Sequence, residues 1–251
     1  MTPGRLYPAC IAAILACTIT SHAETYRWAK TGDTNWNVAA NWLTNGASQV
    51  ATVPPGADDV ADFAGDHPNP VDQPDISGSE SILGLVIRNG YNASTTINGD
   101  GSLTIGANGV ELDSWTFNVN ADLVLGEAQT WLLHYSGGGN DVGQMHLRGD
   151  LSGTGPLTIT ATGDQSGLLY FYRESGVCDF TGGMILETAY DFPHNAVFRF
   201  EAGTVSADGT YAAGGTVGSP GTITLDHGVL RVLADADDGG DTPGHLVDLV
   251  N

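Results

Sequence analysis

The chain has 251 residues, of which 8 are Lys or Arg and 29 are Asp or Glu, so its net charge is −21. Such a chain lacks the clustered cations that nucleic acids and anionic membrane surfaces require, so neither is expected as a partner. Apolar residues make up 41% of the sequence and are spread along it, which argues against intrinsic disorder.

Residues 1–23 have the layout of a secretory signal peptide. Arg5 precedes an apolar run from about Ala9 to Thr20, and Ser21-His22-Ala23 offers small residues for cleavage after Ala23. The run is too short to cross a bilayer as a permanent helix, and no later segment is long and apolar enough. We therefore expect a secreted or cell-surface protein whose mature chain does not span the membrane.

Cleavage after residue 23 would remove Cys10 and Cys17 and leave Cys178 as the last cysteine. No intramolecular disulfide is then expected, and stability has to come from a core or from bound ions. Acylation of Cys17 in "ILAC" is an alternative that the leucine before Ala16 disfavours. The remaining 228 residues (251 − 23) suffice for one all-β domain with its own core.

Three tryptophans gather near the start of the mature chain. Trp36 and Trp42 lie in "TNWNVAANW" and Trp28 lies just upstream, and a Pro-Pro-Gly turn follows in "VPPGADDVADF". We predict that residues 24–75 form an N-terminal cap and first coil, with the rings covering the open end of a core. The alternative is an exposed platform for sugar, which the absence of a recurring aromatic row disfavours.

Short alternating runs separated by Gly, Asn and Asp occupy residues 76–251, and helical periodicity is absent there. Leu85, Leu103, Leu123 and Met145 open successive runs at intervals of 18, 20 and 22 residues. Intervals of this size indicate a solenoid, so we predict a right-handed parallel β-helix over residues 76–251, continuing beyond residue 251 if the native chain is longer. A β-sandwich is the alternative fold.

Alternation within each run assigns side chains to the two faces of a strand. Leu85 and Ile87 are expected inside the solenoid, with Val86 and Arg88 outside. The same pattern repeats in three further pairs of inward residues, which are Leu103 and Ile105, Leu123 and Leu125, and Ile223 and Leu225.

Several motifs occur in an order that resembles a known family. "TNWNVAANW" with "VPPGADDVADF" comes first, followed by "ADLVLGEAQTWLLHYSG", "LRGDLSGTGPLTITATG", "CDFTGGMILETA" and "GSPGTITLDHGVLRV". In this order they resemble bacterial exported proteins with autotransporter-associated β-strand repeats, although Cys178-Asp179-Phe180 stands where an Asn-Tyr pair is usual. The resemblance implies a passenger-type parallel β-helix on or outside the cell surface, and it brings no catalytic motif.

Carboxylates that could act on polysaccharide occur in three groups, which are Asp58, Asp59 and Asp62; Glu111 and Asp113; and Glu187 with Asp191 and His194. A glycosidase needs two such groups that converge on one bond, and the sequence favours solvated polar faces instead. "DHG" at residues 226–228 matches only one fragment of a polygalacturonase-like signature. We therefore expect a non-catalytic structural or adhesion protein.

Two other functions remain as alternatives. One is a polysaccharide lyase or glycoside hydrolase, which rests on analogy between β-helix folds. The other is a carbohydrate-binding module that uses exposed aromatic side chains such as Trp131, Tyr170 and Tyr172. The expected partners are extracellular polysaccharide or cell-surface components.

Calcium is the one ion for which the sequence offers a loop. "DADDGGD" places Asp235, Asp237, Asp238 and Asp241 around two glycines. Calcium takes six to eight oxygen ligands from loops of this kind, so the four aspartates predict a calcium site. A solvated acidic loop is the alternative, since no bidentate Glu closes it. The histidines show no pair at metal-ligand spacing, and no other cofactor is expected.

Overall fold

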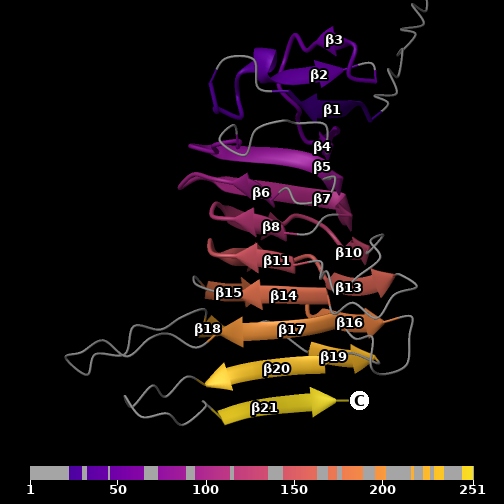
Figure 1. Ribbon diagram of the computed structural model, residues 1–251, viewed down its shortest axis with the longest axis vertical. Helices are drawn as coiled ribbons and strands as arrows, with labels where there is room; N and C mark the ends of the chain where they lie inside the picture. The colour runs from indigo at the N-terminus through magenta and orange to yellow at the C-terminus, as the bar shows by residue number, and fades with distance from the viewer. Residues whose placement is uncertain are drawn as a thin grey trace, which may run out of the picture.

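The chain folds as an all-β parallel solenoid whose strands stack along one long axis (Figure 1). The computed structural model describes residues 23–29, 33–44, 46–64, 73–88, 94–113, 116–134, 144–162, 169–173, 177–188, 196–201, 216–217, 223–226, 229–234 and 245–250. The stack forms a parallel solenoid of about three turns behind an N-terminal cluster of buried tryptophans. The predicted signal peptide covers residues 1–23, of which 1–22 lie outside this set.

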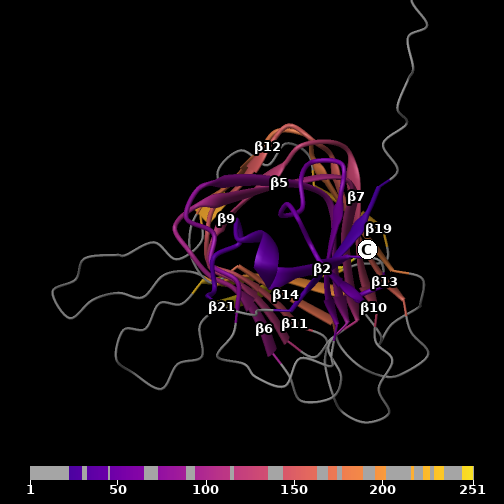
Figure 2. The ribbon, with the colours of Figure 1, turned by 90° about the horizontal axis from the view of Figure 1, so that it is seen from above.

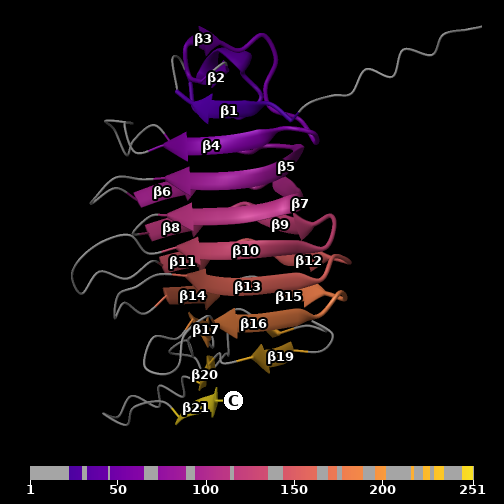
Figure 3. The same ribbon diagram turned by 90° about the vertical axis from the view of Figure 1, so that its right-hand side faces the viewer.

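Three ladders of strands surround the axis, as the view along it shows (Figure 2). The first ladder contains the N-terminal halves of β5 (Ser79–Arg88) and β7 (Ser102–Asp113), then β9 (Asp122–Leu125), β12 (Leu151–Gly153), β15 (Val177–Phe180) and β18 (Thr216–Val217). The second contains β4 (Val60–Ala64), the C-terminal halves of β5 and β7, β10 (Gln129–His134), β13 (Leu157–Thr162), β16 (Met184–Thr188) and β19 (Ile223–Asp226) (Figure 3).

The third ladder is a separate seven-stranded sheet. It consists of β6 (Ser94–Ile97), β8 (Thr116–Val119), β11 (Gln144–Leu147), β14 (Leu169–Arg173), β17 (Ala196–Glu201), β20 (Val229–Ala234) and β21 (His245–Val250). β5 and β7 join the first two ladders into one fourteen-stranded sheet because each strand bends across the corner between them.

Every pairing within the body of the stack is parallel, which confirms the solenoid and excludes a sandwich of antiparallel sheets. The predicted inward residues are also confirmed where side chains are placed: Leu85, Ile87, Leu103, Ile105, Leu123 and Leu125 are all buried. Ile223 and Leu225 take the register positions beside Met184 and Leu186. The right-handed sense of the coil stays a prediction.

The spacing used to predict the solenoid is only partly the true period. Leu103 and Leu123 are register partners, 20 residues apart. Leu85 instead pairs with Val110, and Met145 pairs with Phe117 on the third ladder. The sequence intervals mixed different faces because each coil carries three strands joined by connections of unequal length.

The corners of the coil differ in this respect. From the first ladder to the second, three successive connections, residues 126–128, 154–156 and 181–183, have three residues each, and the last, 218–222, has five. From the second to the third the lengths vary more, from two residues at 114–115 and 227–228 to nine at 135–143. Gly155 sits in one of the short corners, where a Cβ atom would overlap the carbonyl oxygen of Glu127 on the preceding coil. Glycine is therefore required for the backbones of successive coils to approach this closely.

The N-terminal end is closed by a small antiparallel unit. β1 (Thr25–Trp28) pairs in parallel with β4 and in antiparallel fashion with β2 (Trp42–Thr44), which in turn pairs with β3 (Gln49–Val50). The 3-10 helix η1 (Ala39–Asn41) leads into β2. At the other end β21 is antiparallel to β20. Each end of the described stack thus carries strands of reversed direction.

Candidate functional site

The three N-terminal tryptophans lie inside the molecule rather than on a binding surface. Trp36 and Trp42 are 0% exposed and Trp28 is 3% exposed. The ring centroids of Trp28 and Trp42 are 4.9 Å apart and those of Trp36 and Trp42 are 4.8 Å apart, both with edge-to-face geometry. Phe63 of β4 completes the cluster at 5.9 Å from Trp42. The predicted cap is confirmed, and these rings cannot serve as a sugar platform.

Hydrogen bonds fix part of this cap. Trp42 Nε1 donates to the carbonyl oxygen of Trp36 over 2.8 Å, and Asn41 Nδ2 donates to the carbonyl of Asn35 and to Asp33 Oδ1. Among the described residues, three buried side-chain atoms have no hydrogen-bond partner, namely Trp36 Nε1, Asn41 Oδ1 and Asp62 Oδ1. Each unpaired buried group costs about 1–3 kcal/mol. Aromatic burial therefore has to outweigh an imperfect polar network here.

Trp131 is also a core residue. It is 0% exposed, and its Nε1 donates to Gln129 Oε1 over 2.8 Å. Gln129 Nε2 in turn donates to the carbonyl oxygen of Ile105 on the preceding coil, 3.0 Å away. The prediction that Trp131 is an exposed, sugar-binding side chain is therefore wrong. Tyr170 and Tyr172 lie on β14, and their side chains lie outside the described set.

The first group of candidate carboxylates is structural in its contacts. Asp59 Oδ2 accepts a hydrogen bond from the backbone of Gly56 over 2.9 Å, which closes the turn before β4. Asp62 is buried, and its Oδ2 lies 3.4 Å from the guanidinium of Arg27. Asp59 and Asp62 therefore have structural partners, a turn amide and an arginine.

Asp59 also affects a neighbouring phenol. Burial raises the pKa of Tyr26 on β1 above its ordinary value of 10.0, and the nearby negative charges of Asp59 and Glu24 raise it further. The Tyr26 hydroxyl is thus held in its neutral form by its surroundings.

The other carboxylates are distributed along the second ladder. Glu111 is exposed on β7, and Asp113 pairs in register with His134 of β10. Glu187 of β16 pairs in register with Asp226 of β19. Within the residues described, no three His, Cys, Asp or Glu side chains form a group that could hold a metal ion.

Several predicted site residues lie outside the described set. These are Asp191, His194, His227 and the four aspartates of the predicted calcium loop, Asp235, Asp237, Asp238 and Asp241. The calcium site stays a prediction.

The outer side of the third ladder carries a row of polar residues that sequence reasoning missed. Thr96, Asn118 and His146 are successive register partners, and each is partly exposed between buried neighbours. Asn118 Nδ2 lies 3.5 Å from Thr96 Oγ1. Beside this row, Arg148 Nη1 donates to Asn118 Oδ1 and to Asn120 Oδ1, both at 3.3 Å. Hydrogen-bonded side chains therefore link three successive coils.

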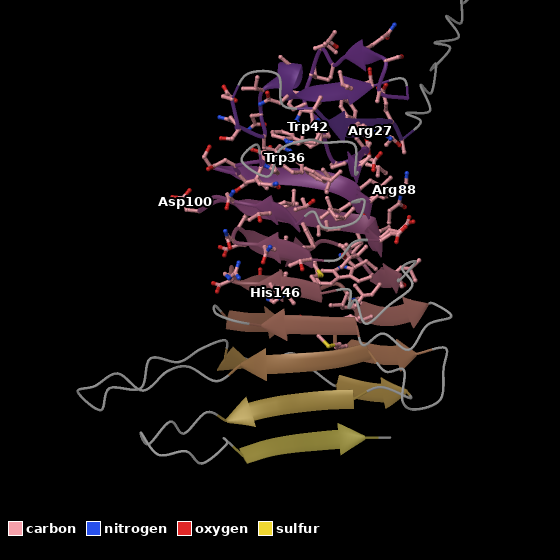
Figure 4. The ribbon with its side chains drawn as sticks, in the orientation of Figure 1. Arg27, Trp36, Trp42, Arg88, Asp100 and His146 are labelled. Atoms are coloured by element: carbon pink, nitrogen blue, oxygen red, sulfur yellow. The ribbon has the colours of Figure 1, made fainter. Side chains whose placement is uncertain are left out.

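Charge is divided unequally between the two sheets. The described strands of the fourteen-stranded sheet hold Arg27 and Arg88 against a larger set of acids, which are Asp62, Glu80, Glu111, Asp113, Asp122, Asp179, Glu187 and Asp226. The described strands of the seven-stranded sheet hold Arg173, Arg199 and Arg231 against Glu201 and Asp248. In Figure 4, Arg27 and Arg88 lie on one side of the stack and His146 on the other.

This distribution could not be read from the sequence, because it depends on which strands share a ladder. The one available signal was that arginines recur within alternating runs, in "YFYRE", "FRFE" and "LRVL". Within the described residues, no helix is long and apolar enough to cross a membrane. No protein-family model, curated protein or solved structure matches this chain.

Proposed function

We propose that this protein is an exported, non-catalytic β-solenoid that acts as a rigid structural or adhesion element outside the cell or on its surface. The observation that supports this most is the parallel stack itself, whose apolar core runs through successive coils and is covered at its N-terminal end by buried tryptophans. A solenoid of this kind presents long, regular rows of side chains, which suits an extended contact surface.

The sequence motifs support the same proposal. Their order resembles that of autotransporter-associated β-strand repeats, and the first 23 residues resemble a signal peptide. Together these features favour a passenger-type protein that contacts polysaccharide or cell-surface components. The Trp cluster supports a structural role, since all three of its indoles are buried.

A second candidate is a polysaccharide lyase or glycoside hydrolase. The observation in its favour is the register pairing of Glu187 with Asp226, because glycoside hydrolysis needs two carboxyl groups that flank one glycosidic bond. Pairing in register alone does not supply an acid and a base of different pKa, so this candidate ranks second.

The two candidates are separated by one assay. Residues 24–251 would be incubated with a panel of soluble and insoluble polysaccharides, with calcium and with chelator, and both retention and new chain ends would be measured. Retention on a polysaccharide without new chain ends supports the non-catalytic proposal, and so does the absence of both retention and new chain ends. Release of chain ends that disappears in Glu187→Gln and persists in Glu111→Gln would overturn it in favour of the enzyme.

Location is tested separately. The full chain with an epitope tag at its C-terminus would be expressed in its native host or in a bacterial host, and the fractions would be compared by immunoblotting. We expect a processed form outside the cytoplasm, and accumulation of the unprocessed chain in the cytoplasm would contradict the proposal.

A further inference from the structure

The outer row of the third ladder continues beyond the coils on which its first members lie. Thr96, Asn118 and His146 begin it. By register, His146 is followed by Tyr172, then Arg199, then Arg231 on β14, β17 and β20. The same backbone pairing that places the partly exposed polar residues in one row therefore also aligns an aromatic residue and two arginines with them.

We propose that this row is a binding surface for an anionic polysaccharide that lies along the solenoid axis. The inference rests on the proposed function and adds the face of the molecule and the chemical class of the partner. Its basis is the register: in a chain of net charge −21, Arg199 and Arg231 occupy neighbouring positions of this row.

The pairing of Arg199 with Arg231 is the strongest single observation. Like charges on directly opposite residues of neighbouring strands destabilise a sheet. Neighbouring strands lie about 4.8 Å apart, so two arginines at paired register positions concentrate positive charge that the carboxylates of an acidic polymer can neutralise. Asp248 pairs with Arg231 in the antiparallel register of β21, which marks the end of the cationic stretch.

The neutral members of the row favour a sugar over other anionic polymers. Thr96 and Asn118 carry hydroxyl and amide groups, which can hydrogen-bond to the hydroxyls of a sugar. Tyr172 adds an aromatic residue, the type that packs against the apolar face of a sugar. Arg148 lies beside the row and bonds two side-chain amides of the preceding coil. A double-stranded nucleic acid carries one negative charge per about 1.7 Å of its axis and needs more clustered cations than two neighbouring arginines supply.

The test uses residues 24–251 and two forms of one polymer, polygalacturonate and its fully methyl-esterified form, which lacks the negative charges. Affinity would be measured by calorimetry for the unmodified protein, Arg199→Gln, Arg231→Gln and the matched control Arg88→Gln on the other sheet. We expect Arg199→Gln and Arg231→Gln to weaken binding of polygalacturonate by about ten-fold each. Arg88→Gln should have little effect, and the ester should not bind.

Three results would overturn the inference: equal binding of the ester, equal weakening by Arg88→Gln, or binding of single-stranded DNA as tight as that of polygalacturonate. Melting curves show whether each variant is folded. Should Arg199→Gln unfold, Arg199→Lys keeps the charge, and salt dependence of the unmodified protein tests the same point. Absence of any binding overturns this inference alone, whereas release of new chain ends overturns the proposed function as well.

Discussion

The indole nitrogen of Trp42 donates a hydrogen bond to the carbonyl oxygen of Trp36 over 2.8 Å, while the indole nitrogen of Trp36 has no partner although it is buried. Two rings that pack edge to face therefore differ in whether the indole N–H has a hydrogen-bond acceptor. Both are fully enclosed, so solvent cannot compensate for the difference.

This asymmetry predicts unequal effects of the same substitution. Trp42→Phe removes a buried hydrogen bond, whereas Trp36→Phe removes an unpaired donor, and both lose the same volume. We expect Trp42→Phe to reduce the free energy of unfolding by about 1–2 kcal/mol more than Trp36→Phe does. Denaturant titration followed by tryptophan fluorescence measures both, and equal losses would show that the hydrogen bond contributes little.

Truncation of the rings tests the cap as a whole. Trp36→Ala and Trp42→Ala are each expected to reduce stability by about 3–5 kcal/mol, because large cavities open in an enclosed cluster. Val53, which is 55% exposed, provides the control, and Val53→Ala should change stability by less than about 0.5 kcal/mol. A cap that unfolds without lowering the melting temperature of the remaining stack would contradict the idea that it covers the core.

The Gln129 side chain bridges Trp131 and the carbonyl of Ile105 inside the solenoid. Gln129→Met keeps the volume and removes both hydrogen bonds, so we expect a loss of about 1–3 kcal/mol. Thr130→Val, on the exposed neighbour, is the matched control. Calorimetric melting distinguishes the two variants, and a neutral Gln129→Met would mean that packing alone sustains this coil.

Gly155 tests the requirement for close approach at a short corner. Gly155→Ala places a Cβ against the backbone of Glu127, so the coils must shift, at a cost of about 1–3 kcal/mol. Gly78→Ala is a suitable control because its Cβ would meet Glu80 Oε1 at an ordinary 3.6 Å. Comparable melting temperatures for the two variants would refute the argument.

The raised pKa of Tyr26 predicts that the stability of the fold depends on pH in the alkaline range. Its pKa is raised in the folded protein, so between the unfolded value of about 10 and the folded value the unfolded chain binds fewer protons. The contribution of Tyr26 to the free energy of unfolding is therefore fully present below pH 10, and it is lost as the pH rises through the folded pKa. Tyr26→Phe should lose stability less steeply over that range in denaturant titrations. Parallel curves for the two proteins would exclude this assignment.

The acidic loop predicts a calcium effect. If Asp235, Asp237, Asp238 and Asp241 ligate calcium, millimolar calcium should raise the melting temperature relative to chelator. Asp237→Asn with Asp241→Asn should abolish the difference. An unchanged melting temperature with and without calcium identifies a solvated acidic loop.

Alternation made the inward residues predictable, since a strand with one buried face leaves little freedom for Leu103 or Ile105. Burial of Trp36 and Trp42 was predictable for a similar reason, as an open end of a core needs apolar cover. The register partners of Leu85 and of Met145 could not be predicted, because they depend on connection lengths that no local pattern encodes. The same limit hid the alignment of Arg199 with Arg231, which is created by register between residues 32 positions apart.

The unequal corners of the coil have a practical consequence. Connections such as 135–143 and 163–168 vary between coils, while 126–128 and 154–156 keep one length. A foreign peptide inserted into a connection between the second and third ladders would lengthen that connection at a small entropic cost. The strands of successive coils would keep their register. The same grafts at the glycine corner would force successive coils apart. Connections whose length already differs between coils are thus the first positions to test for display of an inserted peptide.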